Sequence, residues 1–350
     1  MKNGIKISCK IIAPNKPCFI IAEVGVNHNG SIKLAKKLVD EAKKACADAV
    51  KFQTFKTEEV VTKNAKQTKY QKQNSPAKSQ YEMLKKLELS ESEFEDLSDY
   101  CKRKKIIFLS TPFDFKSASF LHKLGVPAFK ISSGDLTNIP FLIAVAKYKK
   151  PVILSTGMST IFEVKEAEKA IYSTGNRKLI LLHCTSNYPA KYKDINLRAM
   201  ITLRKKFNVP VGYSDHTKGV EIAIAAVSLG ACVIEKHLTL DKNLPGPDHK
   251  SSLEPIEFKK MVETIWNVEL SMGNGVKVPR DSEAELKKAA RKSIVAQEDI
   301  KKGSKLTKEM LAIKRPGTGI EPKYLNKLIG KTLKKNIRKN QILFWDKVKI

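Results

Sequence analysis

The fold is decided by three successive apolar runs that each end in polar side chains, LILLHCT (179–185), VPVGYSD (209–215) and CVIEKHLT (232–239). Apolar residues follow one another in these runs without alternation. This pattern is typical of strands buried on both faces, as in a parallel sheet. Charged segments with helical periodicity lie between them, so the chain alternates strands with helices.

Five more runs of the same kind precede these three along the chain. They are CFIIAEVG (18–25), ADAVKFQ (47–53), IIFLSTP (106–112), AFKISSG (128–134) and PVILSTG (151–157). Eight β/α repeats in about 250 residues predict a (β/α)8 TIM barrel. An open doubly wound sheet is the alternative, but no strand is followed by G-x-G-x-x-G and no G-x-x-x-x-G-K-[ST] motif occurs.

The chain changes its pattern after Gly273-Asn274-Gly275, where Gly, Asn and Pro279 interrupt the helical periodicity. We therefore predict a barrel domain at 1–275, a linker at 276–282 and a small β-rich accessory domain at 283–350. The polar segment from about 54 to 88 is too long for an ordinary barrel loop. It predicts short helical pieces over one barrel mouth, as in a lid.

Composition excludes several classes of protein. The 350 residues are 42% hydrophobic, which provides a large core, and no apolar stretch is long enough to span a membrane. The N-terminus lacks the apolar region of a signal peptide, so a cytoplasmic protein is expected. The six cysteines form no C-x-x-C pair, which argues against a zinc knuckle or a disulfide framework.

The formal net charge of +29 attracts anions. Basic residues alternate with acidic ones along the predicted helices, as in KLAKKLVDEAKK, and no nucleic-acid-binding motif appears. We therefore expect no nucleic-acid partner. A lysine-rich proteome is the favoured explanation of the charge, and a small anionic substrate would explain a local part.

Polar side chains gather at the carboxyl ends of all eight predicted strands. A barrel places these ends on one face, where active sites form. Ordinary solvent-facing polarity would explain one or two such strand ends but not eight. The candidate residues on this face are Glu23, Lys51, Gln53, Thr111, Lys130, Ser133, Asp135, Ser155, Tyr188, Ser214, His216 and His237.

His216 and His237 lie at the ends of the seventh and eighth strands, which are neighbours in a barrel. Two neutral imidazoles completed by water suit Mn²⁺, Co²⁺, Zn²⁺ or similar ions. Glu23, on the adjoining first strand, could complete or support the site. The structural alternative is that each histidine only makes hydrogen bonds within the fold.

Lys51 and Lys130 lie inside apolar strands, and with Lys236 they are the strand-embedded lysines expected to face the mouth. Together with strand-end hydroxyls they would bind phosphate and carboxylate. Either Lys51 or Lys130 could instead form a Schiff base, as in barrel aldolases. Asp248 lies on a Pro/Gly-fixed loop just past the eighth strand, where substrates are selected.

Long motifs that span nearly the whole chain resemble the sialic acid synthase family. They are AEVGVNHNG, DAVKFQTFK, FLSTPFD, FKISSGD, ILSTGM, LLHCTSNYPA, GYSDHT, IEKHLTLDKNLPGPDH and KRPGTGI. The resemblance implies a phosphoenolpyruvate-binding TIM barrel joined to a C-terminal antifreeze-like (SAF) domain. It also implies a transferase that condenses phosphoenolpyruvate with an N-acyl hexosamine aldehyde to give phosphate and a nine-carbon 2-keto acid.

The resemblance assigns roles to individual residues. His216 and His237 would bind a divalent metal, usually Mn²⁺ with Mg²⁺ or Co²⁺ as alternatives, and Glu23 would lie beside the metal and the sugar aldehyde. Arg315 resembles the arginine that the SAF domain lends to a partner subunit, which implies a domain-exchanged homodimer. The residues implied to hold phosphoenolpyruvate are Lys51, Gln53, Thr111, Lys130, Ser133, Ser155 and Ser214, and those implied to bind the sugar are Asp135, Tyr188, Asp248 and Arg315.

Two positions depart from the family pattern. Asp135 stands where the family usually has Glu, and Ser186 stands where it commonly has Asn. Both positions are expected to face the sugar. They bear on which acceptor is used more than on the reaction type.

Three functions remain open at this point. The first is an N-acetylneuraminate synthase acting on N-acetylmannosamine, with N,N′-diacetyllegionaminate synthesis from 2,4-diacetamido-2,4,6-trideoxymannose as its alternative. The second is a Schiff-base pyruvate aldolase on the same barrel. The third is a polyanion-binding protein without enzymatic activity.

Overall fold

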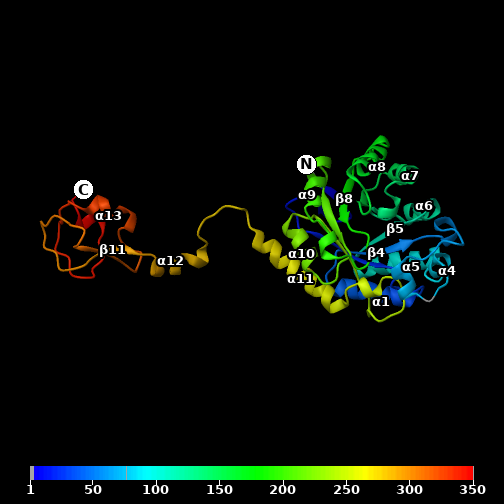
Figure 1. The fold of residues 1–350 in the computed structure, drawn as a ribbon, viewed down its shortest axis with the longest axis horizontal. Helices are drawn as coiled ribbons and strands as arrows, with labels where there is room; N and C mark the ends of the chain where they lie inside the picture. Colours follow the sequence, from blue (N-terminus) through cyan, green and yellow to red (C-terminus); the bar gives the residue numbers. More distant parts are fainter. Residues whose placement is uncertain (1–3, 76, 350) are drawn as a thin grey trace. The chain divides into compact units, whose positions relative to one another are not determined.

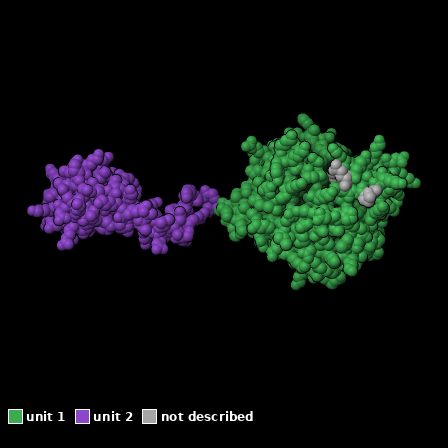
Figure 2. Space-filling view, turned by 60° about the horizontal axis from the view of Figure 1, so that its bottom comes forward, with its two compact units in different colours: residues 1–273 green, residues 274–350 purple. Residues whose placement is uncertain are grey.

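The computed structural model describes residues 4–75 and 77–349, which fall into two compact units divided between Gly273 and Asn274 (Figure 2). The first unit contains eight parallel strands surrounded by helices (Figure 1). The predicted TIM barrel is therefore confirmed. Its strands are β3 (Phe19–Gly25), β4 (Ala49–Thr54), β5 (Ile107–Pro112), β6 (Phe129–Ile131), β7 (Val152–Ser155), β8 (Leu179–Cys184), β9 (Val211–Asp215) and β10 (Val233–His237).

The first and last strands of the barrel pair with each other, so that hydrogen bonds run from β5 through β4, β3, β10, β9, β8 and β7 to β6. The two ends of this sheet, β5 and β6, lie side by side. A helix follows each strand on the outer face of the sheet. These helices are α1 (Ile32–Lys44), α5 (Glu91–Lys104), α6 (Phe115–Leu124), α7 (Ile139–Lys147), α8 (Ile161–Ser173), α9 (Ala199–Phe207), α10 (Glu221–Ser228) and α11 (Pro255–Met272).

Local sequence explains where several helices begin. The Ser31 hydroxyl accepts the N–H of Leu34 at the start of α1. Ser90 and Thr160 form capping boxes with Glu93 and Glu163 at the starts of α5 and α8. Each box pairs two backbone N–H groups that a helix start otherwise leaves without a partner.

An N-terminal hairpin of β1 (Ile5–Ile7) and β2 (Lys10–Ile12) packs on the amino-terminal end of the barrel. Its Ile5, Ile7 and Ile12 side chains join a buried apolar cluster with the barrel-interior residues Phe19, Ile21, Ala49, Leu109, Ile153, Ile180, Leu182 and Val233. A second and larger apolar cluster lies between the sheet and the helices. The lower half of the barrel interior is thus filled by hydrocarbon.

The barrel interior changes from apolar to polar towards the carboxyl ends of the strands. Side chains two residues apart on a strand lie on the same face. Ile21 is followed by Glu23, Leu109 by Thr111 and Ile153 by Ser155, and the first member of each pair belongs to the apolar cluster. The same periodicity brings a polar residue from each strand into the upper half of the barrel.

The segment between β4 and α5 forms three short helices, as the sequence predicts for residues 54–88. They are α2 (Thr57–Val60), α3 (Lys69–Asn74) and α4 (Gln80–Lys85). Across residues 4–75 and 77–349, no helix has both the length and the apolar character needed to cross a lipid bilayer.

The second unit is small and has its own apolar core, which includes Ile294, Leu306, Leu328 and Leu343. An antiparallel pair, β11 (Ser293–Ala296) and β12 (Leu311–Lys314), and several single bridges hold it together. Two helices, α12 (Ala284–Ala290) and α13 (Leu325–Leu328), complete it. This agrees with the small β-rich domain predicted from the sequence.

Gly212 provides a test of packing inside the barrel. A Cβ at this position of β9 would lie 2.4 Å from the Val233 carbonyl oxygen and 2.7 Å from Leu182 Cδ2. The backbone of β10 cannot move away without disturbing the ladder, so Gly212→Ala should lower the free energy of unfolding by about 1–3 kcal/mol. Urea denaturation checks this against Gly134→Ala, where a Cβ meets only Ser132 Oγ at 3.6 Å. Equal stability of the two variants would contradict the packing argument.

Candidate active site

A cavity of about 380 Å³ opens at the carboxyl end of the barrel strands, where the sequence predicts the functional face. Every barrel strand, or the residue directly after it, contributes to its lining. Twelve of the candidate residues line this cavity: Glu23, Lys51, Gln53, Thr111, Lys130, Ser133, Ser155, Tyr188, Ser214, His216, His237 and Asp248.

Two buried lysines and two buried glutamates form the floor of the cavity. Lys51 forms an ion pair with Glu23, and its Nζ lies 3.7 Å from Glu235 Oε2. Lys130 Nζ lies 3.5 Å from Glu235 Oε1. All four side chains are at most 5% exposed, so their charges are balanced by one another and hardly by solvent.

This mutual arrangement shifts the proton affinities of the four groups. Burial raises the pKa of Glu23 to about 7, and the nearby Glu235 carboxylate adds to the rise against the opposing effect of Lys51. Burial lowers the pKa of Lys130, although Glu235 opposes that shift. For Lys51, burial acts to lower the pKa, but Glu23 and Glu235 outweigh it and the pKa is raised.

Hydroxyl groups surround the two lysines. Thr111 Oγ1 accepts a hydrogen bond from Lys51 Nζ at 3.0 Å, and Ser214 Oγ donates to Glu235 Oε1 at 2.9 Å. Ser133 Oγ accepts from the Gly157 N–H at 2.9 Å. Ser155 Oγ is buried and has no hydrogen-bond partner among the described residues. Ammonium and hydroxyl donors therefore point to an anionic ligand at this level of the barrel.

His216 and His237 come together above these groups, with ring centroids 5.4 Å apart. Tyr188 packs on His216, with its ring centroid at 4.2 Å. His216 Nδ1 lies 2.9 Å from the Thr185 carbonyl oxygen, an arrangement that leaves Nε2 as the ring nitrogen for a ligand. The predicted convergence of the two imidazoles is therefore present.

Within the described residues, His237 Nδ1 is buried and has no hydrogen-bond partner, and Asp248 Oδ2 lies 3.8 Å from it. Burial lowers the pKa of His237 well below its usual value, and the positive field of His216 and the lysines adds to this shift. Burial raises the pKa of Asp248 to about 6. A neutral imidazole with a spare lone pair is the form that binds a metal ion.

These features fit a divalent ion held by two protein nitrogens. Among residues 4–75 and 77–349, no three His, Cys, Asp or Glu side chains are grouped as a ligand set. An ion at His216 and His237 would therefore take its remaining ligands from water or substrate, as ions at open catalytic sites do.

The sequence patterns predicted no role for Glu235 and Cys184, which are buried beside the assigned groups of the cavity. Glu235 bridges the two lysines, and Cys184 Sγ lies 3.7 Å from His216 Nδ1. The two-residue strand repeat turns both side chains into the barrel. Glu235 precedes the candidate His237 by two residues, and Cys184 follows the interior residue Leu182 by two. That repeat is the signal that could have identified them.

The prediction that Lys236 faces the mouth is wrong. Lys236 is completely buried and forms an ion pair with Asp215 at 2.8 Å. It lies between Glu235 and His237, both of which line the cavity, so the strand alternation turns it to the opposite face.

One sugar-binding candidate lies outside the cavity, and another belongs to the second unit. Asp135 does not line the cavity, and its carboxylate accepts hydrogen bonds from Ser132 Oγ at 2.8 Å and Asn138 Nδ2 at 3.3 Å. Ser186, the other departure from the family pattern, does line the cavity. Arg315 belongs to the second unit, where its exposed side chain donates from Nε to the Ala290 carbonyl oxygen at 3.1 Å.

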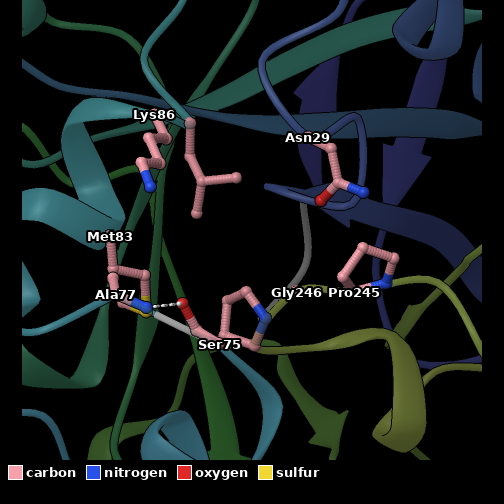
Figure 3. A pocket seen from close by; sticks show the side chains of 9 residues that line it. Asn29, Ser75, Ala77, Met83, Lys86, Pro245 and Gly246 are labelled. Carbon is pink, nitrogen blue, oxygen red and sulfur yellow. Dashed lines mark hydrogen bonds between the residues drawn. The ribbon is translucent and has the colours of Figure 1, made fainter.

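The short helices of residues 54–88 contribute to the mouth, because Gln71, Gln80 and Met83 line the large cavity. A smaller cavity of about 150 Å³ adjoins it and shares Met83, Leu87 and Pro247 with it. Figure 3 shows this smaller cavity between Met83 and Lys86 on one side and Asn29, Pro245 and Gly246 on the other. The segment that the sequence predicts as a lid thus forms one wall of the entrance region.

Known proteins resemble this chain over nearly its whole length. The N,N′-diacetyllegionaminic acid synthase of Legionella pneumophila is 49% identical over 99% of this chain and 98% of its own. The human N-acetylneuraminate-9-phosphate synthase is 37% identical over 90% of this chain and 88% of its own. The crystal structure of a sialic acid synthetase from Leptospira borgpetersenii, in complex with citrate, covers 82% of this chain and 96% of its own with 37% identity and a TM-score of 0.73.

Two families of known sequences divide this chain between them. Residues 38–277 match the NeuB family, and residues 291–349 match the SAF domain. The first match covers the carboxyl ends of all the barrel strands after β3, and with them most of the cavity. The chain therefore belongs to the NeuB family, the sialic acid synthase family that its motifs indicate, and carries a C-terminal SAF domain.

Proposed function

We propose that this protein is a nonulosonic acid synthase, which condenses phosphoenolpyruvate with the open-chain aldehyde of an N-acyl hexosamine. The products are a nine-carbon 2-keto acid and phosphate. One observation carries the proposal: two lysines, several hydroxyls and a histidine pair share a single cavity of about 380 Å³ in a chain of the NeuB family.

Phosphoenolpyruvate would lie on the floor of the cavity. Lys51 and Lys130 would bind its phosphate and carboxylate, with Gln53, Thr111, Ser133, Ser155 and Ser214 around them. Such contacts hold the C3 carbon of phosphoenolpyruvate in one orientation towards the acceptor, which favours reaction through proximity. The unpaired Ser155 hydroxyl supports this placement, because a buried donor without a partner is costly unless a ligand satisfies it.

The acceptor would lie above, near the two histidines. His216 and His237 would hold a divalent ion, with Mn²⁺ as our first choice and Mg²⁺ or Co²⁺ as alternatives. When bound, such an ion supplies Lewis-acid polarisation of the aldehyde oxygen. Tyr188 and Asp248 would contact the acylamino sugar. Glu23, whose pKa is about 7, is our candidate for exchanging a proton with the aldehyde oxygen.

The reaction forms one carbon–carbon bond and breaks one carbon–oxygen bond. C3 of phosphoenolpyruvate attacks the aldehyde carbon, and the aldehyde oxygen takes up a proton. Water adds to C2 and loses a proton, and the bond between C2 and the phosphate oxygen then breaks. Phosphate leaves with the electron pair and takes up the remaining proton of the C2 hydroxyl, and C2 becomes the ketone of the product.

Our choice of acceptor is supported by the relatives. The Legionella diacetyllegionaminic acid synthase is more similar to this chain than the human N-acetylneuraminate-9-phosphate synthase is, at 49% against 37% identity. This favours 2,4-diacetamido-2,4,6-trideoxymannose over N-acetylmannosamine, the acceptor placed first in the sequence analysis. Both sugars carry the N-acyl group and the aldehyde that the proposal requires.

A phosphate-release assay tests the function. Phosphoenolpyruvate with 2,4-diacetamido-2,4,6-trideoxymannose should release phosphate and give a 2-keto acid, and N-acetylmannosamine should react more slowly. EDTA should abolish turnover and Mn²⁺ should restore it, because His216 and His237 alone cannot polarise the aldehyde. Full activity in metal-stripped protein would refute the metal site, and trapping of a pyruvate adduct by borohydride would instead support the Schiff-base aldolase.

Replacement of Lys130 tests the phosphoenolpyruvate site. Lys130→Met should weaken phosphoenolpyruvate binding by about 10- to 100-fold, since a hydrogen bond to a charged group contributes roughly 1.5–3 kcal/mol. The KM for the sugar should change far less. The matched control is Lys165→Met, which removes a lysine paired with Glu168 on the outer helix α8. An unchanged KM for phosphoenolpyruvate in folded Lys130→Met would contradict the assignment.

Mixing of inactive variants tests the role of Arg315. A guanidinium suits acyl and hydroxyl oxygens, and we propose that Arg315 reaches the site of a partner subunit in a domain-exchanged homodimer. His237→Ala and Arg315→Ala should each be inactive alone, and subunit exchange between them should restore part of the activity. One barrel of a mixed dimer then has both its histidines and an intact arginine.

The same experiment can reject the exchange. If size-exclusion and labelling measurements prove that the subunits have exchanged, but no activity returns, then Arg315 does not act across subunits. Mixing His237→Ala with His216→Ala is the control, because each barrel in that mixture lacks one histidine and the partner's SAF domain cannot replace it.

A further inference from the structure

A buried ion pair lies directly behind the two histidines. Asp215 precedes His216 and Lys236 precedes His237, and the side chains of Asp215 and Lys236 are both 0% exposed. The two residues are opposite each other in the ladder between β9 and β10. They face away from the cavity, so neither can contact a substrate there.

The Lys236 ammonium connects the two segments that carry the imidazoles. Its Nζ donates to Asp215 Oδ2 at 2.8 Å and to the Thr217 carbonyl oxygen at 2.6 Å. Asp215 Oδ1 in turn accepts from the N–H and the hydroxyl of Thr217 at 2.9 and 2.8 Å. Both neighbours of His216 are thus tied to the neighbour of His237.

These hydrogen bonds lie at the carboxyl end of the ladder between β9 and β10. Strand β9 finishes at Asp215, and the pairing of Lys236 with Asp215 is its last register position with β10. His216 therefore lies beyond the ladder. Its Nδ1 hydrogen-bonds with the Thr185 carbonyl oxygen, and its own carbonyl oxygen accepts the Ala190 N–H. Both partners belong to the segment after β8, so these bonds do not link His216 to the strand of His237.

Stability alone does not account for this pair. Apolar side chains of similar volume often replace a buried ion pair without loss of stability, because they avoid the cost of removing two charges from water. Asp215 and Lys236 face the layer between the sheet and the helices, where the buried cluster is apolar. The geometry that the pair imposes is therefore the better explanation of its presence.

We propose that the Asp215–Lys236 pair is a positioning device, which holds His216 and His237 at the separation and orientation needed to share one divalent ion. This inference rests on the metal site of the proposed function. Hydrogen-bonded groups behind metal ligands commonly change metal affinity by 10- to 100-fold when they are removed.

Direct metal binding by the full-length, metal-stripped protein tests the inference. The main variant is Asp215→Leu/Lys236→Met, which removes both charges and leaves every cavity residue in place. Free Mn²⁺ measured by electron paramagnetic resonance should show its affinity for Mn²⁺ lowered by about 10- to 100-fold. The visible spectrum of bound Co²⁺ should also change, whereas the metal-free melting temperature should stay close to that of the wild type.

The control is Lys242→Met/Glu257→Gln, which removes a partly exposed ion pair on the outside of the barrel at 2.5 Å. It should leave Mn²⁺ affinity and the Co²⁺ spectrum unchanged. Thr217→Val provides a milder change, because it removes only the hydroxyl bond to Asp215. If the double variant fails to fold, Thr217→Val should still weaken Mn²⁺ binding and shift the Co²⁺ spectrum.

Two outcomes would overturn the inference, and they can be told apart from failure of the metal site. Wild-type Mn²⁺ affinity and an unaltered Co²⁺ spectrum in a folded double variant would refute positioning by the pair. If the double variant does not fold, the same result in Thr217→Val would refute it. If wild type and His216→Ala bind Mn²⁺ equally, the two-histidine site is itself wrong and the inference falls with it.

Discussion

The alternation of side chains along each barrel strand is the constraint on which the rest of the structure depends. It sends residues of one parity into the barrel and those of the other parity towards the helices. In the lower half the inward residues are hydrocarbon, such as Ile21 and Ile153, and two positions later they are Glu23 and Ser155. A shift of one residue in any strand would bury the cavity groups among the helices and place apolar side chains in the cavity.

The same alternation explains how so many charged groups can be buried in one place. Lys51 and Lys130 pair with Glu23 and Glu235 inside the barrel, so the floor of the cavity carries balanced charge before any ligand arrives. An incoming anion therefore exchanges partners with the glutamates and does not meet bare ammonium groups. The overall charge of +29 has little part in this, because solvent screens the outer lysines while the buried groups interact at short range.

Much of the fold and of the site could be predicted from the sequence, because both are periodic. The eight apolar runs predicted the strands, and their polar ends predicted the residues that line the cavity. Lys236 was predicted to face the mouth because it lies near a strand end. That prediction ignored which of the two alternating faces of the strand its side chain occupies. The hydrogen bonds that hold Asp135 within its own turn depend on the tertiary path after β6, which no local pattern encodes. The surroundings of Arg315 in an assembly depend on how two units are arranged, and neither local pattern nor strand parity carries that information.

The hairpin of β1 and β2 determines from which end of the barrel a molecule can reach the cavity. Because Ile5, Ile7 and Ile12 seal the amino-terminal end of the barrel with hydrocarbon, charged molecules reach the lysines from the opposite end, where the strands finish. The cavity is therefore closed below by apolar side chains and opens towards the carboxyl ends of the strands. Two ligands bound one above the other in such a cavity would have to enter in a fixed order, the deeper one first, and leave in the reverse order.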